Sequence, residues 1–320
     1  MKVARLFFVF LFACSSLATA DRPTGATIIR TDYANARFMT QTAHFEIHHD
    51  CVLDQNCIDF NRFEQTHDAI VWYFSRLGLS LRPINHESRM RVRIFDDWNT
   101  RSRDIAAVGL NLNGRAAIFD AQQNCVFFVV QFPGSSLDAA VQEAYLRTVL
   151  QHEIAHAVLT NSSVFAFGAI YPLWLSEGFA CLFEVPLPCC NGEQIPVNDL
   201  RLADIGSPQE LPSIGTLLRR IQPWDGDRVN SAKRYAHAWA LAHFLIHRHR
   251  DGMRSFLQKI MTIEPNSGDV HHVAIDEFEA AFGPADNKLD KEWRAYVADL
   301  IARAKTPDHV ATPSDANAAP

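Results

Sequence analysis

The chain has 320 residues, of which 48% are hydrophobic and 21% charged, a composition typical of globular proteins. Its formal charge of −6 and the lack of any dense basic cluster argue against a nucleic-acid partner. After the N-terminal region, no stretch approaches the roughly 18 consecutive apolar residues of a membrane-spanning helix. We therefore expect a protein without a transmembrane segment.

The N-terminus has the pattern of an export signal. Lys2 and Arg5 precede a short apolar run, and residues 18–20 (Ala-Thr-Ala) have the small-x-small form that signal peptidase cleaves. We predict a signal peptide over residues 1–20 and an exported protein, either periplasmic or extracellular. The alternative is lipoprotein processing at Cys14, which would leave a lipid anchor on that residue.

Cysteine usage agrees with export. Apart from Cys14 the cysteines are even in number, which in an exported chain favours disulfide bonds. Cys51 and Cys57 flank a short polar segment and form a candidate local pair. Cys189 and Cys190 are adjacent, so we expect them to bond to different partners.

Hydrophobic spacing predicts strands in the first half of the chain and helices in the second. Residues 21–40 show no regular pattern. Strands are predicted at residues 42–49, 90–95, 116–119 and 125–132, and helices at residues 60–79, 137–160, 177–184, 233–249, 253–262, 275–282 and 289–305. This order predicts an α+β fold, in which a strand-rich region (40–135) packs on a mostly helical region (136–305) within one domain spanning 21–305. The tail over 306–320 is rich in Ala, Pro and Asp, and is predicted to be disordered.

The helix predicted over 137–160 carries the motif His152-Glu153-Ile154-Ala155-His156. Residues four apart lie on the same face of a helix, so His152 and His156 can bind one ion. Two imidazole ligands suit zinc, and Glu153 can stand beside the water molecule that the ion activates. The alternative is a pair of histidines facing solvent, but the motif lies among apolar residues, where unpartnered polar groups would be costly.

A third ligand is offered by Glu177, which lies 21 positions after His156 in the sequence Pro-Leu-Trp-Leu-Ser-Glu-Gly-Phe-Ala. We expect Glu177 to start a second helix that forms a hairpin with the first. Two histidines and one carboxylate are a known catalytic zinc set, so the sequence predicts one Zn²⁺ per chain bound by His152, His156 and Glu177. The centre would lie on a central helix between the two regions of the fold.

The histidine motif followed by a Trp-Leu-x-Glu-Gly-x-Ala block resembles the gluzincin zinc metallopeptidases of the peptidase-MA-like clan. The block is closer to the aminopeptidase N branch than to thermolysin. It is also similar to small secreted bacterial members of uncharacterised function, those of the domain of unknown function 1570 type. The resemblance covers residues 137–245. The Gly-x-Met-Glu-Asn segment with which aminopeptidase N relatives hold a free amine is missing, so endo- and exopeptidase activity both remain open.

The resemblance implies two further site residues. Glu184 lies seven positions after Glu177, about two helical turns, so the two glutamates are expected to share a helical face. Glu184 would orient a zinc histidine; the alternative is a solvated surface glutamate. Tyr235 would head the helix predicted at 233–249 and stabilise an oxyanion, with His237 as the second candidate for that role. The alternative for Tyr235 is a core tyrosine.

The expected function is that of a zinc-dependent peptidase, in which Glu153 activates a zinc-bound water molecule against a peptide or protein substrate. The alternatives are a zinc hydrolase of a non-peptide bond and an inactive gluzincin-like binding protein. The strand region around 116–130 is expected to pair with an extended peptide. His243 and His247 are four apart, but no third ligand for a second metal is evident near them.

Overall fold

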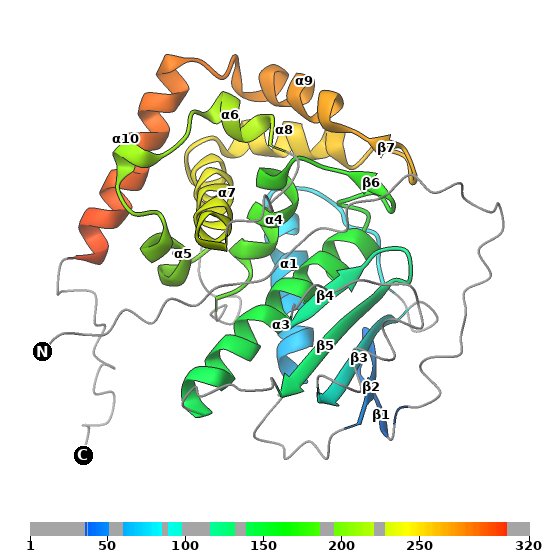
Figure 1. Ribbon diagram of the computed structural model, residues 1–320. Coiled ribbons are helices and arrows are strands. Elements are labelled where there is room, and N and C mark those ends of the chain that lie inside the picture. The colour runs from blue at the N-terminus through cyan, green and yellow to red at the C-terminus, as the bar shows by residue number, and fades with distance from the viewer. Residues whose placement is uncertain are drawn as a thin grey trace, which may run out of the picture.

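The computed structural model describes residues 36, 38–50, 60–84, 89–97, 116–131, 139–185, 195–220 and 228–305. Its sheet belongs to the first half of the described chain and most of its helices to the second (Figure 1), which confirms the α+β class. The predicted signal peptide, Cys14 and the tail from 306 lie outside the described residues. Among the helices of the described part, none is long and apolar enough to cross a membrane.

In the described part of the chain, five strands form one mixed sheet in the order β1-β2-β3-β5-β4. Strands β2, β3 and β5 run parallel, while β1 and β4 pair antiparallel at the ends of this order. The strands are β1 (Phe38–Gln41), β2 (Phe45–His49), β3 (Met90–Asp97), β4 (Ala117–Asp120) and β5 (Cys125–Gln131). The four predicted strands are confirmed. Strand β1 was not predicted, because Phe38 and Met39 are exposed and give no alternation between a buried and a solvated face.

Helices α1 (Asn61–Arg76) and α3 (Ala139–Asn161) pack against each other on one face of the sheet. On β2, Phe45 and Ile47 are fully buried, and the Phe45 ring meets Phe63 of α1 edge to face at 5.6 Å. Helix α3 packs against β3, β4 and β5. The helix that carries the histidine motif is thus held against a rigid sheet.

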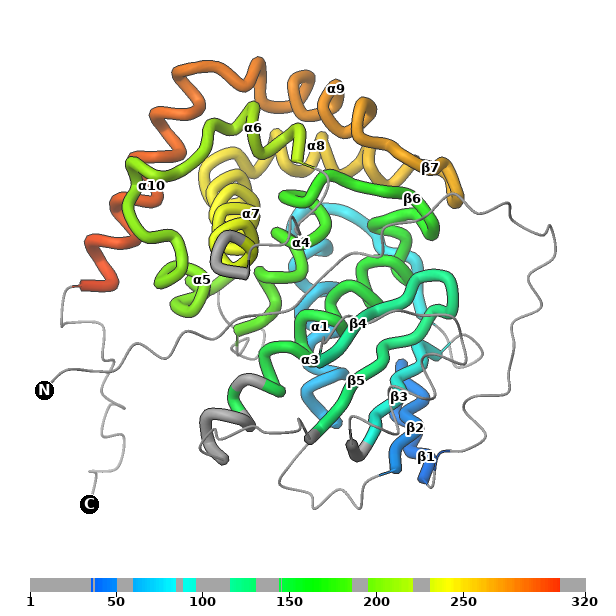
Figure 2. Tube along the Cα trace, in the orientation of Figure 1, coloured from blue at the N-terminus to red at the C-terminus, as the bar shows by residue number. Residues whose placement is uncertain are grey.

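The second half of the chain surrounds helix α7 (Arg228–Arg248), which packs most extensively on α4 (Leu173–Leu182). In Figures 1 and 2, α7 lies between α4 and the outer elements α5, α6 and α10, all of which contact it. The other elements are α5 (Asp199–Asp204), η2 (Pro208–Glu210), α6 (Ile214–Leu218), α8 (Arg250–Ile260), α9 (His271–Phe282), α10 (Asn287–Ala304) and the short parallel strands β6 (Ala169–Ile170) and β7 (Gly268–Asp269).

The predicted helices are present, but five of them (α4, α7, α8, α9 and α10) begin earlier than expected, and two of these shifts change the place of a site residue. Helix α4 begins directly after Pro172, whose fixed φ suits the start of a helix, so Glu177 lies inside it rather than at its first residue. Helix α7 begins at Arg228, so Tyr235 lies two turns inside and does not head the helix. Helix α4 also ends at Leu182, which leaves Glu184 beyond the helix. The expectation that Glu177 and Glu184 share a helical face is therefore wrong.

Gly178 sets the distance between α4 and α7. A Cβ atom at this position would lie 2.6 Å from the carbonyl oxygen of Ala238 and 3.3 Å from the Cβ of Ala242, both on α7. The first contact is with helix backbone, which cannot move aside as a flexible side chain can. The glycine next to Glu177 therefore allows the two helices to approach closely.

We predict that Gly178→Ala lowers the free energy of unfolding by about 1–3 kcal/mol, the usual cost of overpacking, although alanine is the better helix former. Urea denaturation followed by circular dichroism measures the change. Gly215→Ala is the matched control, since the nearest atom to its added Cβ is the flexible end of Arg219, at 3.3 Å, and the nearest backbone atom of another segment, the Ala285 carbonyl oxygen, lies at an ordinary contact distance of 4.0 Å. Equal stability of the two variants would contradict the role given to Gly178.

Candidate metal centre

The three predicted metal ligands meet at one point. On α3, His152 and His156 bring their Nε2 atoms within 3.1 Å of each other. From α4, the Glu177 Oε2 atom lies 3.0 Å from His152 Nε2 and 3.2 Å from His156 Nε2. One turn of helix α3 and the middle of α4 thus present three possible ligand atoms as a nearly equilateral triangle.

This triangle has the dimensions of a tetrahedral zinc site. With bonds of about 2.0 Å, neighbouring ligand atoms of a regular tetrahedron lie about 3.3 Å apart. The edges of 3.0, 3.1 and 3.2 Å are close to that value. The His152 and Glu177 side chains are buried, whereas the His156 side chain is 15% exposed, so the His156 side of the triangle lies nearest to solvent. The three side chains therefore fit a tetrahedral zinc ion whose fourth coordination position would be taken by a small molecule such as water.

The surroundings of the triangle favour positive charge. Burial lowers the pKa of His152, but hydrogen bonds with Cys181, Glu177 and Glu184 outweigh it and raise that pKa well above its usual value. Burial raises the pKa of Glu177, yet the two histidines outweigh it and hold that pKa far below its usual value. A buried glutamate that remains ionised requires a cation beside it, either a metal ion or a protonated imidazole.

Glu153 lies next to the triangle and does not form part of it. Its side chain is almost fully buried, and its Oε2 atom accepts a 2.6 Å hydrogen bond from the backbone N–H of Phe119. Burial raises the pKa of Glu153, and the neighbouring Glu177 adds to the rise, while the two histidines oppose it. The contact with Phe119 could not be predicted from the sequence, because it is made by a backbone N–H of a distant strand and depends on no particular side chain.

Glu184 orients His152 from the other side of the ring. Its Oε1 atom lies 2.7 Å from His152 Nδ1, so this nitrogen is bonded while Nε2 faces the triangle. Glu184 is itself held by the Arg201 guanidinium, whose Nε donates to Oε2 at 2.8 Å and whose terminal nitrogen donates to Oε1. Burial raises the pKa of Glu184, but Arg201 and His152 outweigh it and lower that pKa to about 2.

Asn198 and Arg201 were not predicted as site residues. Asn198 caps α5 by accepting a hydrogen bond from the backbone N–H of Arg201, and its side-chain amide donates to Glu184 Oε2 at 2.8 Å. It also donates to the Cys181 carbonyl oxygen at 3.0 Å. An asparagine followed three residues later by an arginine is only a weak helix-start signal, so the sequence could not reveal that both residues hold Glu184.

His152, Cys181 and Glu184 form a second group that could hold a metal ion, and it shares His152 with the first. Burial raises the pKa of the Cys181 thiol to about 11, so at neutral pH the thiol is protonated and is a poor ligand. The Arg201 guanidinium already occupies Glu184 and would repel a cation there. The group of His152, His156 and Glu177 is therefore the better metal site.

Tyr235 lies against the candidate centre. Its ring centroid is 5.9 Å from that of His152 in an edge-to-face arrangement, and the Arg201 guanidinium covers its face at 5.3 Å. The side chain is fully buried. His237, two residues further along α7, points elsewhere, since residues i and i+2 of a helix lie on different faces. Burial, with help from Arg220 and Lys233, lowers the pKa of His237 to about 4, so this ring is neutral at physiological pH.

The remaining histidines of α7 have structural partners. The Tyr296 hydroxyl lies 2.8 Å from His243 Nδ1, and His247 Nε2 lies 3.2 Å from the Ile195 carbonyl oxygen. These contacts occupy one nitrogen of each ring with protein groups. Within the described residues, neither histidine belongs to a group of three possible metal ligands.

The predicted disulfides are only partly within the described residues. Cys125 and Cys181 are buried thiols, and the Cys125 Sγ donates to the Val126 carbonyl oxygen. Neither residue joins the predicted disulfide framework. The candidate pair Cys51 and Cys57, and also Cys189 and Cys190, lie outside the described residues.

Comparison with protein families matches residues 146–267 to a family described as "Protein of unknown function (DUF1570)". The matched stretch contains the triangle, Glu153, Glu184, Arg201 and Tyr235. It is similar to that family over less than half of the chain, and the match confirms the resemblance to the domain of unknown function 1570. No curated protein matches the sequence.

Glu184→Gln tests the support of His152. A neutral amide would bind Arg201 and His152 more weakly, so we predict that the affinity for Zn²⁺ falls about 10- to 100-fold. Competition with a chromophoric chelator measures this affinity. Glu210→Gln, which changes a glutamate with an exposed side chain, is the matched control and should bind Zn²⁺ like the unaltered protein. If Glu184→Gln folds and keeps its affinity, Glu184 does not support the centre.

Proposed function

We propose that the chain is a zinc-dependent peptidase of the gluzincin type. The observation that carries the proposal is the triangle of His152, His156 and Glu177, with edges of 3.0–3.2 Å, beside the buried carboxylate of Glu153. Two imidazoles and one carboxylate with an open position are a ligand set of catalytic rather than structural zinc. A bound Zn²⁺ would supply Lewis acidity, which lowers the pKa of water toward about 7 and polarises a carbonyl group.

Glu153 is proposed as the general base. Its Oε2 atom is held by the Phe119 N–H, which fixes the carboxylate plane and leaves Oε1 to accept a proton from water. Its pKa, raised by burial, brings the carboxylate closer to the range where it can take a proton and later release it to the leaving amine. A solvated glutamate would hold that proton less well.

Tyr235 is proposed to stabilise the oxyanion. The ring packs edge-on against His152, so its phenol is held near the reacting centre by the α4–α7 contact. His237 is less suited, because it lies on another face of α7.

Strand β4 is proposed to bind an extended peptide. It is the last strand of the sheet in the described part of the chain, and α3 packs beside it. Because the Ala116 carbonyl accepts a hydrogen bond from Val129, the backbone groups of Ala117 and Phe119 point away from β5. Glu153 accepts the hydrogen bond of the Phe119 N–H. A peptide that paired with the remaining outward-facing backbone groups of β4 would pass close to Glu153.

Glu153→Gln is predicted to keep Zn²⁺ and to lose at least about 100-fold in turnover, because an amide cannot accept the proton. A peptide library analysed by mass spectrometry, with and without chelator, measures cleavage and shows whether cuts are internal or terminal. His156→Ala is the companion variant and should lose Zn²⁺ as well as activity. Near-normal cleavage by Glu153→Gln would refute the mechanism, and full zinc content in His156→Ala would refute the ligand set.

Tyr235→Phe removes only the phenol oxygen. We predict that it lowers kcat by about 10²- to 10³-fold, the usual loss for one oxyanion donor, with zinc content unchanged. His237→Gln serves as the comparison and should retain most of its activity. The reverse result, in which His237→Gln is inactive and Tyr235→Phe is not, would transfer the role to His237.

A further inference from the structure

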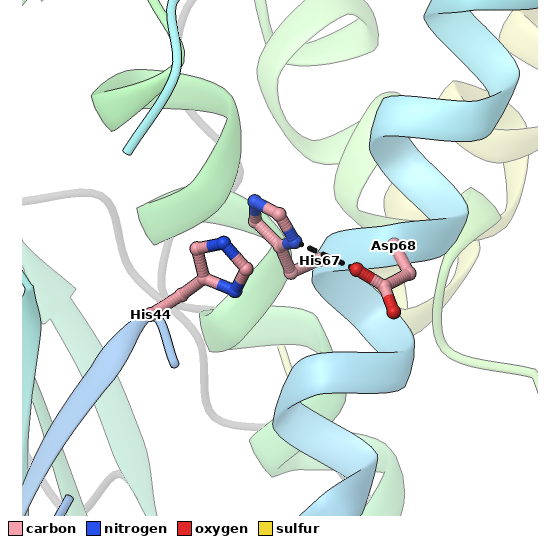
Figure 3. Close-up of side chains that lie close together, drawn as sticks. All are labelled: His44, His67 and Asp68. Carbon is pink, nitrogen blue, oxygen red and sulfur yellow. Dashed lines mark hydrogen bonds and ion pairs between the residues drawn. The ribbon is translucent and has the colours of Figure 1, made fainter. Parts of the chain in front are cut away.

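Three side chains near the start of β2 lie close together without suiting a metal ion. His44 precedes β2, and His67 and Asp68 are neighbours on α1 (Figure 3). The two imidazole rings are stacked, with centroids 3.6 Å apart and planes inclined by 21°. Their Nδ1 atoms already face Glu64 and Asp68. The free lone pair of an imidazole lies in the plane of its ring, so those of two stacked rings cannot converge on one ion.

A reciprocal pair of amides joins the β4–β5 hairpin to the C-terminal end of α3. The Asn124 side-chain amide donates to Asn161 Oδ1 at 2.9 Å, and the Asn161 amide donates to Asn124 Oδ1 at 2.8 Å. Asn161 is the last residue of α3, and its amide also donates to the Ala157 carbonyl oxygen at 2.8 Å. Two hydrogen bonds between the same planar groups fix their relative rotation as well as their distance. The tip of the hairpin is therefore attached to the helix that carries the histidine motif.

The turn of this hairpin is held by several further contacts. Asp120 Oδ1 accepts the backbone N–H groups of Gln122 and Gln123 at 2.7 and 3.1 Å, as an aspartate that closes a turn commonly does. The Arg91 guanidinium on β3 donates to the Gln123 carbonyl oxygen. Asn124 has a φ of +48°, in the left-handed region that asparagine and glycine adopt most readily. A turn held in this way passes any displacement of its tip on to β4.

Strand β4 contacts Glu153 just before this turn. The Phe119 N–H points away from β5 and donates to Glu153 Oε2 at 2.6 Å. Asn161 follows Glu153 by eight residues, or about 12 Å along α3. Strand β4 packs beside α3 (Figure 1) and is thus attached to it by hydrogen bonds at both Glu153 and Asn161. The attachment at Asn161 can be removed without altering Glu153 itself.

We propose that Asn124 and Asn161 are positioning residues for the general base. By attaching the hairpin to the end of α3, the amide pair keeps the Phe119 N–H on Glu153 Oε2 and thereby fixes the plane of the carboxylate. Glu153 is 4% exposed, so water cannot readily replace this donor if the hairpin moves away. The inference rests on the proposed function, in which Glu153 takes a proton from water.

The test compares Asn124→Gly with Asn266→Gly in the full-length protein loaded with Zn²⁺. Glycine keeps the left-handed backbone at both positions, where φ is +48° and +60°, so each variant loses only a side chain. Asn266 is not part of the amide pair and is the matched control. We expect Asn124→Gly to lower kcat for a peptide substrate at least about tenfold, with zinc content unchanged, because small misplacements of a reacting group are costly. Asn266→Gly should match the parent.

Asn161→Ala removes the same pair from the helix side, with a residue that favours helix. It should reduce kcat as Asn124→Gly does. The double variant should lose no more than either single variant, because both substitutions remove one interaction. Independent losses that multiply in the double variant would contradict a shared role.

Exchange of the Phe119 amide hydrogen tests the attachment without any turnover. This N–H is bonded to Glu153 and not to β5, so its exchange rate reports on the bond that the amide pair is proposed to keep. NMR should show exchange at least about tenfold faster in Asn124→Gly than in Asn266→Gly. The amides through which β5 pairs with β3 should keep their rates, since a local release leaves the centre of the sheet intact.

The positioning role is overturned if Asn124→Gly matches Asn266→Gly in kcat and in Phe119 exchange. Equal acceleration of the Phe119 and β5 amides would also overturn it, because the pair would then only stabilise the fold. A parent protein that cleaves no peptide would refute the proposed function instead, and the exchange of Phe119 would still decide whether the pair holds β4 against α3.

Discussion

The candidate centre depends on His152 being bonded at both ring nitrogens. Nε2 faces Glu177 and His156, and Nδ1 faces Glu184, at 3.0, 3.1 and 2.7 Å respectively. A ring held in this way can neither rotate nor change its tautomer without losing a buried hydrogen bond. The residue is fully buried, so water cannot replace a lost partner. The position of the triangle is therefore set by the groups that hold His152.

These groups come from the helical half of the chain, whereas the histidines lie on the helix that packs against the sheet. Helix α4 carries Glu177, and its close contact with α7 at Gly178 keeps both helices in place. Arg201 connects α5 to the same group, because it binds Glu184 through two hydrogen bonds and covers the ring of Tyr235 on α7. A substitution in α5 or α7 could thus displace the three candidate ligands without changing any of those residues.

The sequence predicted site residues correctly where their placement depends on neighbours in the same helix. The four-residue spacing of His152 and His156 predicted their shared face. An expected helical hairpin added Glu177, and the family resemblance added Glu184. Helix starts were less accurate, because the apolar run after Pro172 also fits a loop that enters the core. Arg201 and Phe119 could not be predicted, since their contacts with glutamates 17 and 34 residues away depend on the tertiary fold. That zinc fills the triangle remains a prediction.

The early end of α4 explains how two glutamates can serve one histidine. Had the helix continued, Glu177 and Glu184 would share a face, and two buried carboxylates on one side of His152 would repel each other. A proline at position 186 disfavours helical backbone at Val185, and the chain leaves the helix after Leu182. Glu184 then reaches the opposite nitrogen, where Arg201 balances its charge. Glu177 is left as the one carboxylate among the three corners of the triangle, so the attraction for a cation is directed to the side of His152 on which His156 lies.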